Sequence, residues 1–193
     1  MSAQPEVYLS PDEYLLQERQ RAYKSEYLAG HIYALAGGSR RHNLLVANIV
    51  AALHRQLRQR SCTVYPSDLR IHIPGRNYYT YPDVSVACEP LRFTDDEQDT
   101  VLNPVVIIEV LSKSTENYDR GRKFKHYRTI TSFQEYLLIA QDSVHIEHYV
   151  RQPDNQWLFV DVDDPNETIV LSCIQCDLLV TDIYEKVDVT AHE

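Results

Sequence analysis

The chain lacks the features that would assign it to a membrane or to the secretory route. Its 193 residues contain no apolar run near the roughly 20 residues that a membrane-spanning helix needs. Its first residues, MSAQPEVYLSPDEY, have neither the basic start nor the apolar core of a signal peptide. Repeats, low-complexity tracts and linkers are also missing. We therefore expect one cytoplasmic domain without a membrane partner.

Cysteine is scarce, and its spacing indicates little chemistry. Cys62 and Cys88 are isolated in the sequence, and Cys173 and Cys176 form the only CxxC pair. A structural zinc site would need about two more ligands. Because the pair lies in the apolar run TIVLSCIQCDLLV, we interpret it as two buried thiols.

Positive charge is scarce overall, since the formal net charge is −9. The excess acid belongs to the last third: residues 1–133 hold 17 Lys and Arg against 15 Asp and Glu, whereas residues 134–193 hold 2 against 13. Two segments, 40–60 and 120–128, each carry five Lys or Arg and no acid. A locally basic face could still bind phosphates, and a solvated helix surface is the other interpretation.

The pattern of apolar residues predicts a mixed α/β fold. Ser10, Pro11 and Glu13 form a helix start with a capping box. The predicted elements are a helix at 10–22, a hairpin within 25–38, a helix at 39–60, strands near 63–66, 69–74, 80–88 and 104–112, a helix at about 117–130, a strand at 134–140, a hairpin of 144–150 with 156–162, a strand at 168–171 and a last turn. Residues 89–103 form a polar, acidic loop in this prediction. Helices on both faces of a central sheet would suit the unbroken VVII run.

Two carboxylates lie within predicted buried strands. Asp83 belongs to the strand at 80–88, and Glu109 ends the aliphatic run of the strand at 104–112. A buried carboxylate is costly unless something compensates it. Mg²⁺ or Mn²⁺ would do so, held by Asp83, Glu109, the backbone carbonyl of Val110 and water. Such an ion activates water and polarises a phosphoryl group, and a lysine from the basic helix would stabilise the charge that develops.

The same residues carry a resemblance to a known family. The blocks YPDVSV, VVIIEVLSKST, YDRGRKFKHYR and QEYLLIA, with SEYLAGHIYALAGGSRRH upstream, resemble the Uma-two family of restriction endonucleases, in the PD-(D/E)xK nuclease superfamily. The resemblance covers roughly residues 8–185, the expected core of a single domain at 1–193. It implies a restriction-endonuclease-like mixed central sheet flanked by helices, with an N-terminal helix and hairpin. It also implies a divalent-metal-dependent endonuclease that hydrolyses DNA.

The resemblance assigns roles to individual residues. It implies that Asp83 and Glu109 are metal ligands and catalytic acids. The superfamily usually places its lysine two residues after the second acid, where this chain has Leu111. The family instead has a lysine on the following helix, which Lys123 matches.

Four further positions follow from the comparison with the family pattern. Glu26, before the hairpin glycine, and His42, at the start of the long helix, match recurrent family positions and are auxiliary candidates. Lys113 stands where the family commonly has proline, and it adds a second candidate lysine. Ala140 replaces an aspartate that often ends this strand in the family. The acid pair and Lys123 are intact.

DNA is the partner that this assignment implies. Candidates for phosphate contacts are Arg40, Arg41, Arg120, Arg122 and Lys125. The sequence contains no helix-turn-helix or zinc finger, so recognition would come from the nuclease fold or from another protein. A homodimer is plausible because double-strand cutters often act in pairs, and no small-molecule cofactor is expected.

Each assignment has an alternative. Asp83 could cap a turn after Pro82, Glu109 could pair with a buried Lys or Arg, and Lys123 could lie on a basic helix surface. His42 and Glu26 could pack or cap locally. At the level of function, two alternatives stay open: a catalytically inactive nuclease-fold protein that binds nucleic acid or protein, and a metal-dependent phosphoesterase for small substrates.

Overall fold

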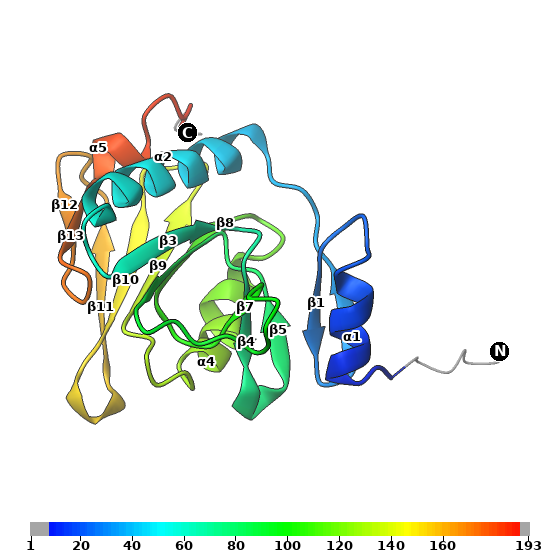
Figure 1. Cartoon of the computed structure of the whole chain (residues 1–193). Coiled ribbons are helices and arrows are strands. Elements are labelled where there is room, and N and C mark those ends of the chain that lie inside the picture. The colour runs from blue at the N-terminus through cyan, green and yellow to red at the C-terminus, as the bar shows by residue number, and fades with distance from the viewer. Residues whose placement is uncertain (1–7, 190–193) are drawn as a thin grey trace.

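The computed structural model describes residues 8–189 and has the expected mixed α/β architecture (Figure 1). The predicted domain bounds, 1–193, and the first residues, on which the prediction about a signal peptide depends, extend beyond this range. The helical elements are α1 (Pro11–Glu18), α2 (Arg40–Leu57), η1 (Pro74–Arg76), α3 (Glu116–Tyr118), the π-helical turn η2 (Asp119–Lys123), α4 (Phe124–Tyr127), η3 (Pro153–Asn155) and α5 (Val180–Ile183).

The strands form two sheets and a separate hairpin. They are β1 (Ser25–Leu28), β2 (His31–Ala34), β3 (Cys62–Pro66), β4 (Arg70–Ile73), β5 (Tyr78–Thr80), β6 (Val84–Cys88), β7 (Thr100–Val101), β8 (Pro104–Leu111), β9 (Glu135–Ala140), β10 (Ile146–Arg151), β11 (Trp157–Val162), β12 (Thr168–Leu171) and β13 (Cys176–Leu179). The six-stranded sheet has the order β11-β10-β9-β8-β6-β3, and the five-stranded sheet has the order β2-β1-β5-β4-β7. In the six-stranded sheet, β8 and β9 are parallel and the other neighbours are antiparallel.

Helix α2 covers one face of the six-stranded sheet (Figure 1). Its apolar stripe repeats every four residues and is buried, as predicted. The stripe consists of Leu45, Ile49, Leu53 and Leu57. It shares a core with every second residue of β8, namely Val106, Ile108 and Val110. No helix within residues 8–189 is long and apolar enough to cross a membrane.

The remaining residues of β8 point to the opposite face of the sheet. Ile107 and Leu111 pack there in a second core with Phe124 and Tyr127, which come from α4, and with residues of the five-stranded sheet. Because side chains alternate along a strand, Glu109 lies on this second face. The predicted site residue therefore points into the space between the six-stranded sheet, α4 and the five-stranded sheet.

The predicted strand at 80–88 is divided between the two sheets. β5 ends at Thr80, β6 begins at Val84, and residues 81–83 cross from one sheet to the other. Pro82 has no N–H group to donate to a ladder, so a continuous strand through it would lose a hydrogen bond. The division leaves Asp83 half-buried, just before β6, rather than inside a strand.

The cysteines differ from the expectation. Cys62 and Cys88 lie opposite each other in the β3–β6 ladder and form a disulfide. Cys176 is a buried thiol, as predicted, but the prediction was wrong for Cys173, which is exposed. Cys173 lies in the turn between β12 and β13, and the sequence analysis did not anticipate β13.

The start of α1 agrees with the sequence prediction, and the loop after β6 differs from it. Ser10 caps α1 and Glu13 completes the capping box, as predicted. The loop predicted at 89–103 contains the short strand β7, which pairs in parallel with β4. A two-residue strand has too little periodicity to be recognised in a sequence.

Candidate active site

Asp83 and Glu109 come together because β6 and β8 are antiparallel neighbours. Val84 lies opposite Ile108, which brings the preceding Asp83 beside the following Glu109. The backbone N–H of Asp83 donates to Glu109 Oε2 at 3.3 Å, and the N–H of Val110 donates to Asp83 Oδ2 at 2.8 Å. The structure thus brings the two predicted acids together. Val110 contacts the pair through its N–H, whereas the sequence analysis assigned its carbonyl.

Lys123 reaches this pair from the π-helical turn η2. Its Nζ lies 2.8 Å from Glu109 Oε1, 3.6 Å from Glu26 Oε1 and 3.7 Å from Asp119 Oδ1. The residue is only 7% exposed, so it is not a surface lysine. The structure therefore excludes the alternative in which Lys123 lies on a basic helix surface. It shows the alternative in which Glu109 pairs with a buried cation, and that cation is Lys123.

Buried hydroxyl groups hold the carboxylates of Glu109 and Glu26. Tyr127 donates to Glu109 Oε1 at 2.9 Å. Tyr78 donates to Glu26 Oε2 at 2.8 Å, and Thr80 donates to Glu26 Oε1. Tyr127 is fully buried, and its hydroxyl–carboxylate bond joins distant segments, which leaves no periodic signal in the sequence. These hydroxyls partly compensate the cost of burying two acids in one space.

His42 contacts Asp83 from the first turn of α2. Its Nε2 lies 3.0 Å from Asp83 Oδ1. Ser39 caps the helix by accepting a hydrogen bond from the N–H of His42, which fixes this turn. A Cβ atom at Gly38 would lie 2.5 Å from His42 Nδ1, so the histidine ring requires glycine at that position. The auxiliary candidate His42 therefore contacts the predicted acid directly.

The electrostatics of the site are dominated by burial. Burial raises the pKa of Glu109 to about 8; the charge of Lys123 opposes this shift and that of Asp83 adds to it. Burial also raises the pKa of Asp119 above its ordinary value. Burial opposes the charge on Lys123, but Glu109 and its other neighbours raise the pKa of Lys123 well above its ordinary value. A bound divalent cation would offset the cost of burying these acids.

Glu109 should make the metal-free protein less stable as pH rises from about 4.5 to about 8. Its carboxyl titrates near 4.5 in the unfolded chain and near 8 in the fold. Between these values the folded state binds more protons, so the free energy of unfolding falls with pH. The slope from this group is at most about 1.4 kcal/mol per pH unit. Urea unfolding in EDTA at pH 5, 6.5 and 8 measures it, with Glu109→Gln as the comparison. Glu109→Gln should show a flatter pH dependence, and parallel curves would contradict the assignment.

The ligands in the site suit a hard cation in one particular binding mode. Asp83 and Glu109 offer carboxylate oxygens, which Mg²⁺ and Mn²⁺ prefer. Within residues 8–189, no group of three or more His, Cys, Asp or Glu side chains is arranged to hold a metal ion. Mg²⁺ is commonly bound by one or two carboxylates, with water and substrate phosphate completing its shell. The acid pair fits that mode and does not form a cage of protein ligands.

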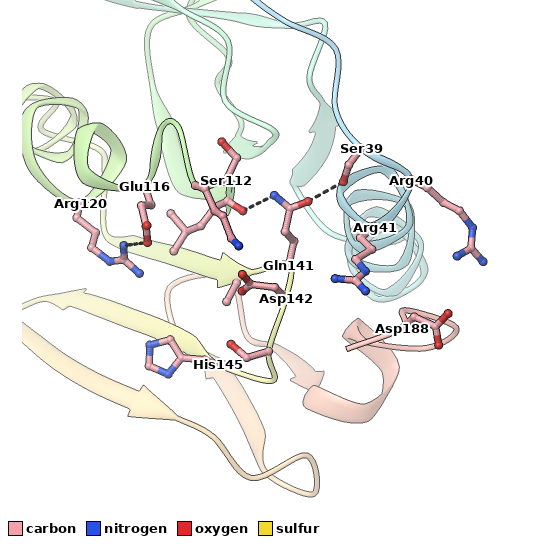
Figure 2. A pocket seen from close by; sticks show the side chains of 14 residues that line it. Ser39, Arg40, Arg41, Ser112, Glu116, Arg120, Gln141, Asp142, His145 and Asp188 are labelled. Carbon is pink, nitrogen blue, oxygen red and sulfur yellow. Dashed lines mark hydrogen bonds and ion pairs between the residues drawn. The ribbon is translucent and has the colours of Figure 1, made fainter. Parts of the chain in front are cut away.

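A pocket of about 720 Å³ lies between the start of α2, the end of β8 and the turn between β9 and β10 (Figure 2). It does not include Asp83 or Glu109, but it adjoins them: Leu111, two residues after Glu109, and Arg41, next to His42, line its wall. The predicted basic residues that line it are Arg40, Arg41, Lys113 and Arg120.

Gln141 connects two sides of this pocket. Its Nε2 donates to the carbonyl of Leu111 at 2.9 Å, and the hydroxyl of Ser39 donates to Gln141 Oε1 at 2.6 Å (Figure 2). The end of β8 is thereby tied to the N-cap of α2. Because both elements carry residues of the acid site, Gln141 also fixes the pocket relative to that site.

The predicted phosphate-binding residues fall into separate places. Arg120 lines the pocket, but its guanidinium pairs with Glu116 and lies 2.6 Å from Glu147 Oε1, so its charge is already balanced. Arg122 and Lys125 are exposed and do not line the pocket. Lys113 is exposed at the pocket wall.

Arg122 and Lys125 belong to a second basic surface. Burial lowers the pKa of His126, and the nearby charges of Arg76, Arg122 and Lys125 lower it further. The His126 ring packs edge-on against Tyr78, whose hydroxyl donates to Glu26 and lies 3.0 Å from that of Tyr118. This second basic surface is therefore next to the residues that hold Glu26, apart from the pocket.

These features define a class of protein. A mixed sheet flanked by helices, with two acids and a lysine converging at adjacent strands, is the architecture of a restriction-endonuclease-like nuclease fold. The chain belongs to the Uma2 (Uma-two) family: a family model described as "Putative restriction endonuclease" matches residues 11–181.

Individual proteins resemble the chain over most of its length. Uncharacterized protein sll1609 of Synechocystis sp. (strain ATCC 27184 / PCC 6803 / Kazusa) is 42% identical over 164 residues, which cover 85% of this chain and 93% of that protein. Uncharacterized protein slr1290 of the same organism is 38% identical over 178 residues, or 91% of each chain. A crystal structure described as a "putative nuclease belonging to DUF820", from Anabaena variabilis ATCC 29413, matches with a TM-score of 0.72 and 19% identity over 91% of this chain and 97% of that one. This last similarity establishes the fold.

Proposed function

We propose that this protein is a divalent-metal-dependent endonuclease that hydrolyses phosphodiester bonds in DNA. The observation that carries the proposal is the contact network of half-buried Asp83 with buried Glu109 and Lys123, beside a pocket lined by basic residues. Charged groups are costly to remove from water, and these three match the chemistry that phosphoryl transfer requires. The single-domain organisation and the cytoplasmic location stay predictions.

Each residue has a defined part in this proposal. Asp83 and Glu109 would hold Mg²⁺ or Mn²⁺, which when bound polarises the phosphoryl oxygen and lowers the pKa of the attacking water. Lys123, whose pKa is raised by the neighbouring acids, would donate hydrogen bonds from Nζ to the oxygens on which negative charge develops. His42 and Tyr127 position the two carboxylates through their contacts with Asp83 and Glu109.

One observation favours a second candidate, a nuclease-fold protein that binds nucleic acid without cleaving it. Both oxygens of each acid already have a protein partner: His42 and the N–H of Val110 for Asp83, and Lys123 with the N–H of Asp83 for Glu109. A cation must displace part of this network in order to bind. A network that is satisfied without metal is also what an inactive member of the fold would keep.

Plasmid nicking separates the two candidates. Supercoiled plasmid is incubated with purified protein in Mg²⁺, in Mn²⁺ and in EDTA, and relaxed and linear forms are quantified. The endonuclease proposal predicts cleavage in at least one metal and none in EDTA. Plasmid that stays supercoiled in both metals, although the protein retards it in a gel, would establish the second candidate instead.

Arg40 and Arg41 should contribute to DNA binding by neutralising phosphates. The double variant Arg40→Ala/Arg41→Ala should weaken binding and reduce the slope of log K against log salt by about one for each phosphate that is no longer neutralised. Fluorescence anisotropy with a labelled duplex in EDTA, at several salt concentrations, measures both quantities.

Arg55→Ala/Arg58→Ala provides the matched control. Both arginines are exposed at the other end of the same helical segment, away from the pocket, so their removal should change binding little. An equal weakening in the two double variants would mean that only the net charge matters, and the pocket would lose its assigned role.

A further inference from the structure

The outer edge of the six-stranded sheet is apolar and open. β11 is the terminal strand of this sheet, and its hairpin with β10 lies on the side of the molecule opposite α1 (Figure 1). Three consecutive residues of β11 are exposed: Leu158 at 52%, Phe159 at 47% and Val160 at 41%. Exposed edge strands in monomers are normally protected by charge, proline or a bulge. The segment from Trp157 to Val160 has none of these.

The backbone of β11 presents unpaired hydrogen-bonding groups in a defined pattern. The N–H of Gln152 donates to the carbonyl of Gln156, so this pair is hydrogen-bonded across the β10–β11 hairpin. Because hydrogen-bonded pairs alternate along an antiparallel ladder, Leu158 and Val160 point their backbone groups toward β10. The backbone groups of Trp157, Phe159 and Asp161 therefore point outward, toward the open edge.

We infer that β11 pairs antiparallel with β11 of a second copy of this chain, with Phe159 opposite Phe159 of that copy. Outward-pointing residues must pair with outward-pointing residues, and this register also places Trp157 opposite Asp161. On the other face, Leu158 lies opposite Val160. Apolar side chains then meet on both faces of a continuous sheet, and each chain contributes the same strand, as a two-fold dimer requires.

Charge favours the antiparallel orientation over the parallel one. Arg151 lies opposite Trp157 on β10, and its guanidinium is 5.3 Å from the Trp157 ring. Within residues 8–189 no carboxylate lies within 4.0 Å of Arg151. In the paired sheet, Asp161 of the second copy lies opposite Trp157. Arg151 lies on the same face of the sheet, on the other side of Trp157. Parallel pairing would instead bring the acidic ends of the two strands, at Asp161 and Asp163, together.

Sedimentation velocity tests the dimer, independently of the nuclease proposal. Wild-type protein should sediment as a species whose mass is twice that of the chain. Phe159→Pro should be monomeric, because proline removes the outward N–H group that would bond to the second copy. That N–H group makes no hydrogen bond to β10, so the hairpin itself should be kept. Leu16→Arg is the control: it changes a residue that is 62% exposed at the opposite side, and it should stay dimeric. Thermal melting of each variant reports whether it is folded.

Cross-linking tests the register without relying on a disruptive variant. In a Cys173→Ser background, Phe159→Cys should form a covalent dimer under mild oxidation. A hydrogen-bonded antiparallel pair has Cα atoms about 5.5 Å apart, within the range that a disulfide spans. Val170→Cys, at a residue that is 54% exposed on β12, should not cross-link. Wild-type protein that is monomeric at its highest soluble concentration would overturn the inference, as would equal cross-linking of the two cysteine variants.

Discussion

Glu109→Gln and Asp83→Asn should each abolish metal-dependent plasmid nicking. Either change removes a carboxylate from the pair and leaves the other acid to hold the cation alone. A metal ion contributes several kcal/mol to such a transition state, so the rate should fall by at least about 10³-fold. Initial rates of nicking in Mg²⁺ and in Mn²⁺ measure the effect.

Glu135→Gln is the matched control for these variants. Glu135 is a buried strand carboxylate on β9, the neighbour of β8, but it pairs with His148 at 2.7 Å rather than with the site. This variant should keep its activity while it is folded, as monitored by thermal melting. Undiminished cleavage by Glu109→Gln and Asp83→Asn would show that the activity comes from another site or from a contaminant.

Lys123→Met should lower both stability and activity. It removes the cation that lies among Glu109, Glu26 and Asp119 and leaves buried carboxylates without a counter-charge. Loss of one partner of a buried pair typically costs about 3–5 kcal/mol of unfolding free energy. Loss of one donor to the developing charge lowers the rate by about 10²–10³-fold. Urea unfolding and nicking rates measure the two effects.

Lys113→Met identifies which lysine acts. Lys113 is exposed at the pocket wall, so its replacement should leave stability unchanged and lower activity only through weaker DNA binding. Raising the DNA concentration should then restore its rate, whereas Lys123→Met should stay slow at saturating DNA. The opposite outcome would transfer the catalytic assignment to Lys113.

Local sequence patterns predicted the elements that carry the site. The four-residue stripe of α2 and the unbroken run of β8 leave a strong periodic signal, and Ser10 with Glu13 marks the start of α1. The apolar runs around Asp83 and Glu109 predicted neighbouring strands, whereas the convergence of the two acids also depends on the register that places Val84 opposite Ile108. The family resemblance added Lys123, which no periodicity distinguishes from the other basic residues of its helix.

Features that depend on register or on a change of helix type were not predictable. The Cys62–Cys88 disulfide requires knowledge that β3 and β6 pair in one particular register. Lys123 is buried at the end of a π-helical turn, residues 119–123, which a basic sequence gives no reason to expect. Arg120 pairs with Glu147 because η2 approaches β10, although these two elements are far apart in the sequence. Such contacts are decided by tertiary packing.

Calorimetric titration with Mn²⁺ and Mg²⁺ measures whether Asp83 and Glu109 hold a divalent cation together. We predict one cation bound per chain by wild type, with binding that becomes tighter from pH 6 to pH 8.5 because Glu109 must lose its proton. We also predict that Asp83→Asn and Glu109→Gln each lose this binding. Folded wild-type protein that takes up no cation, or variants that bind as wild type does, would contradict this prediction.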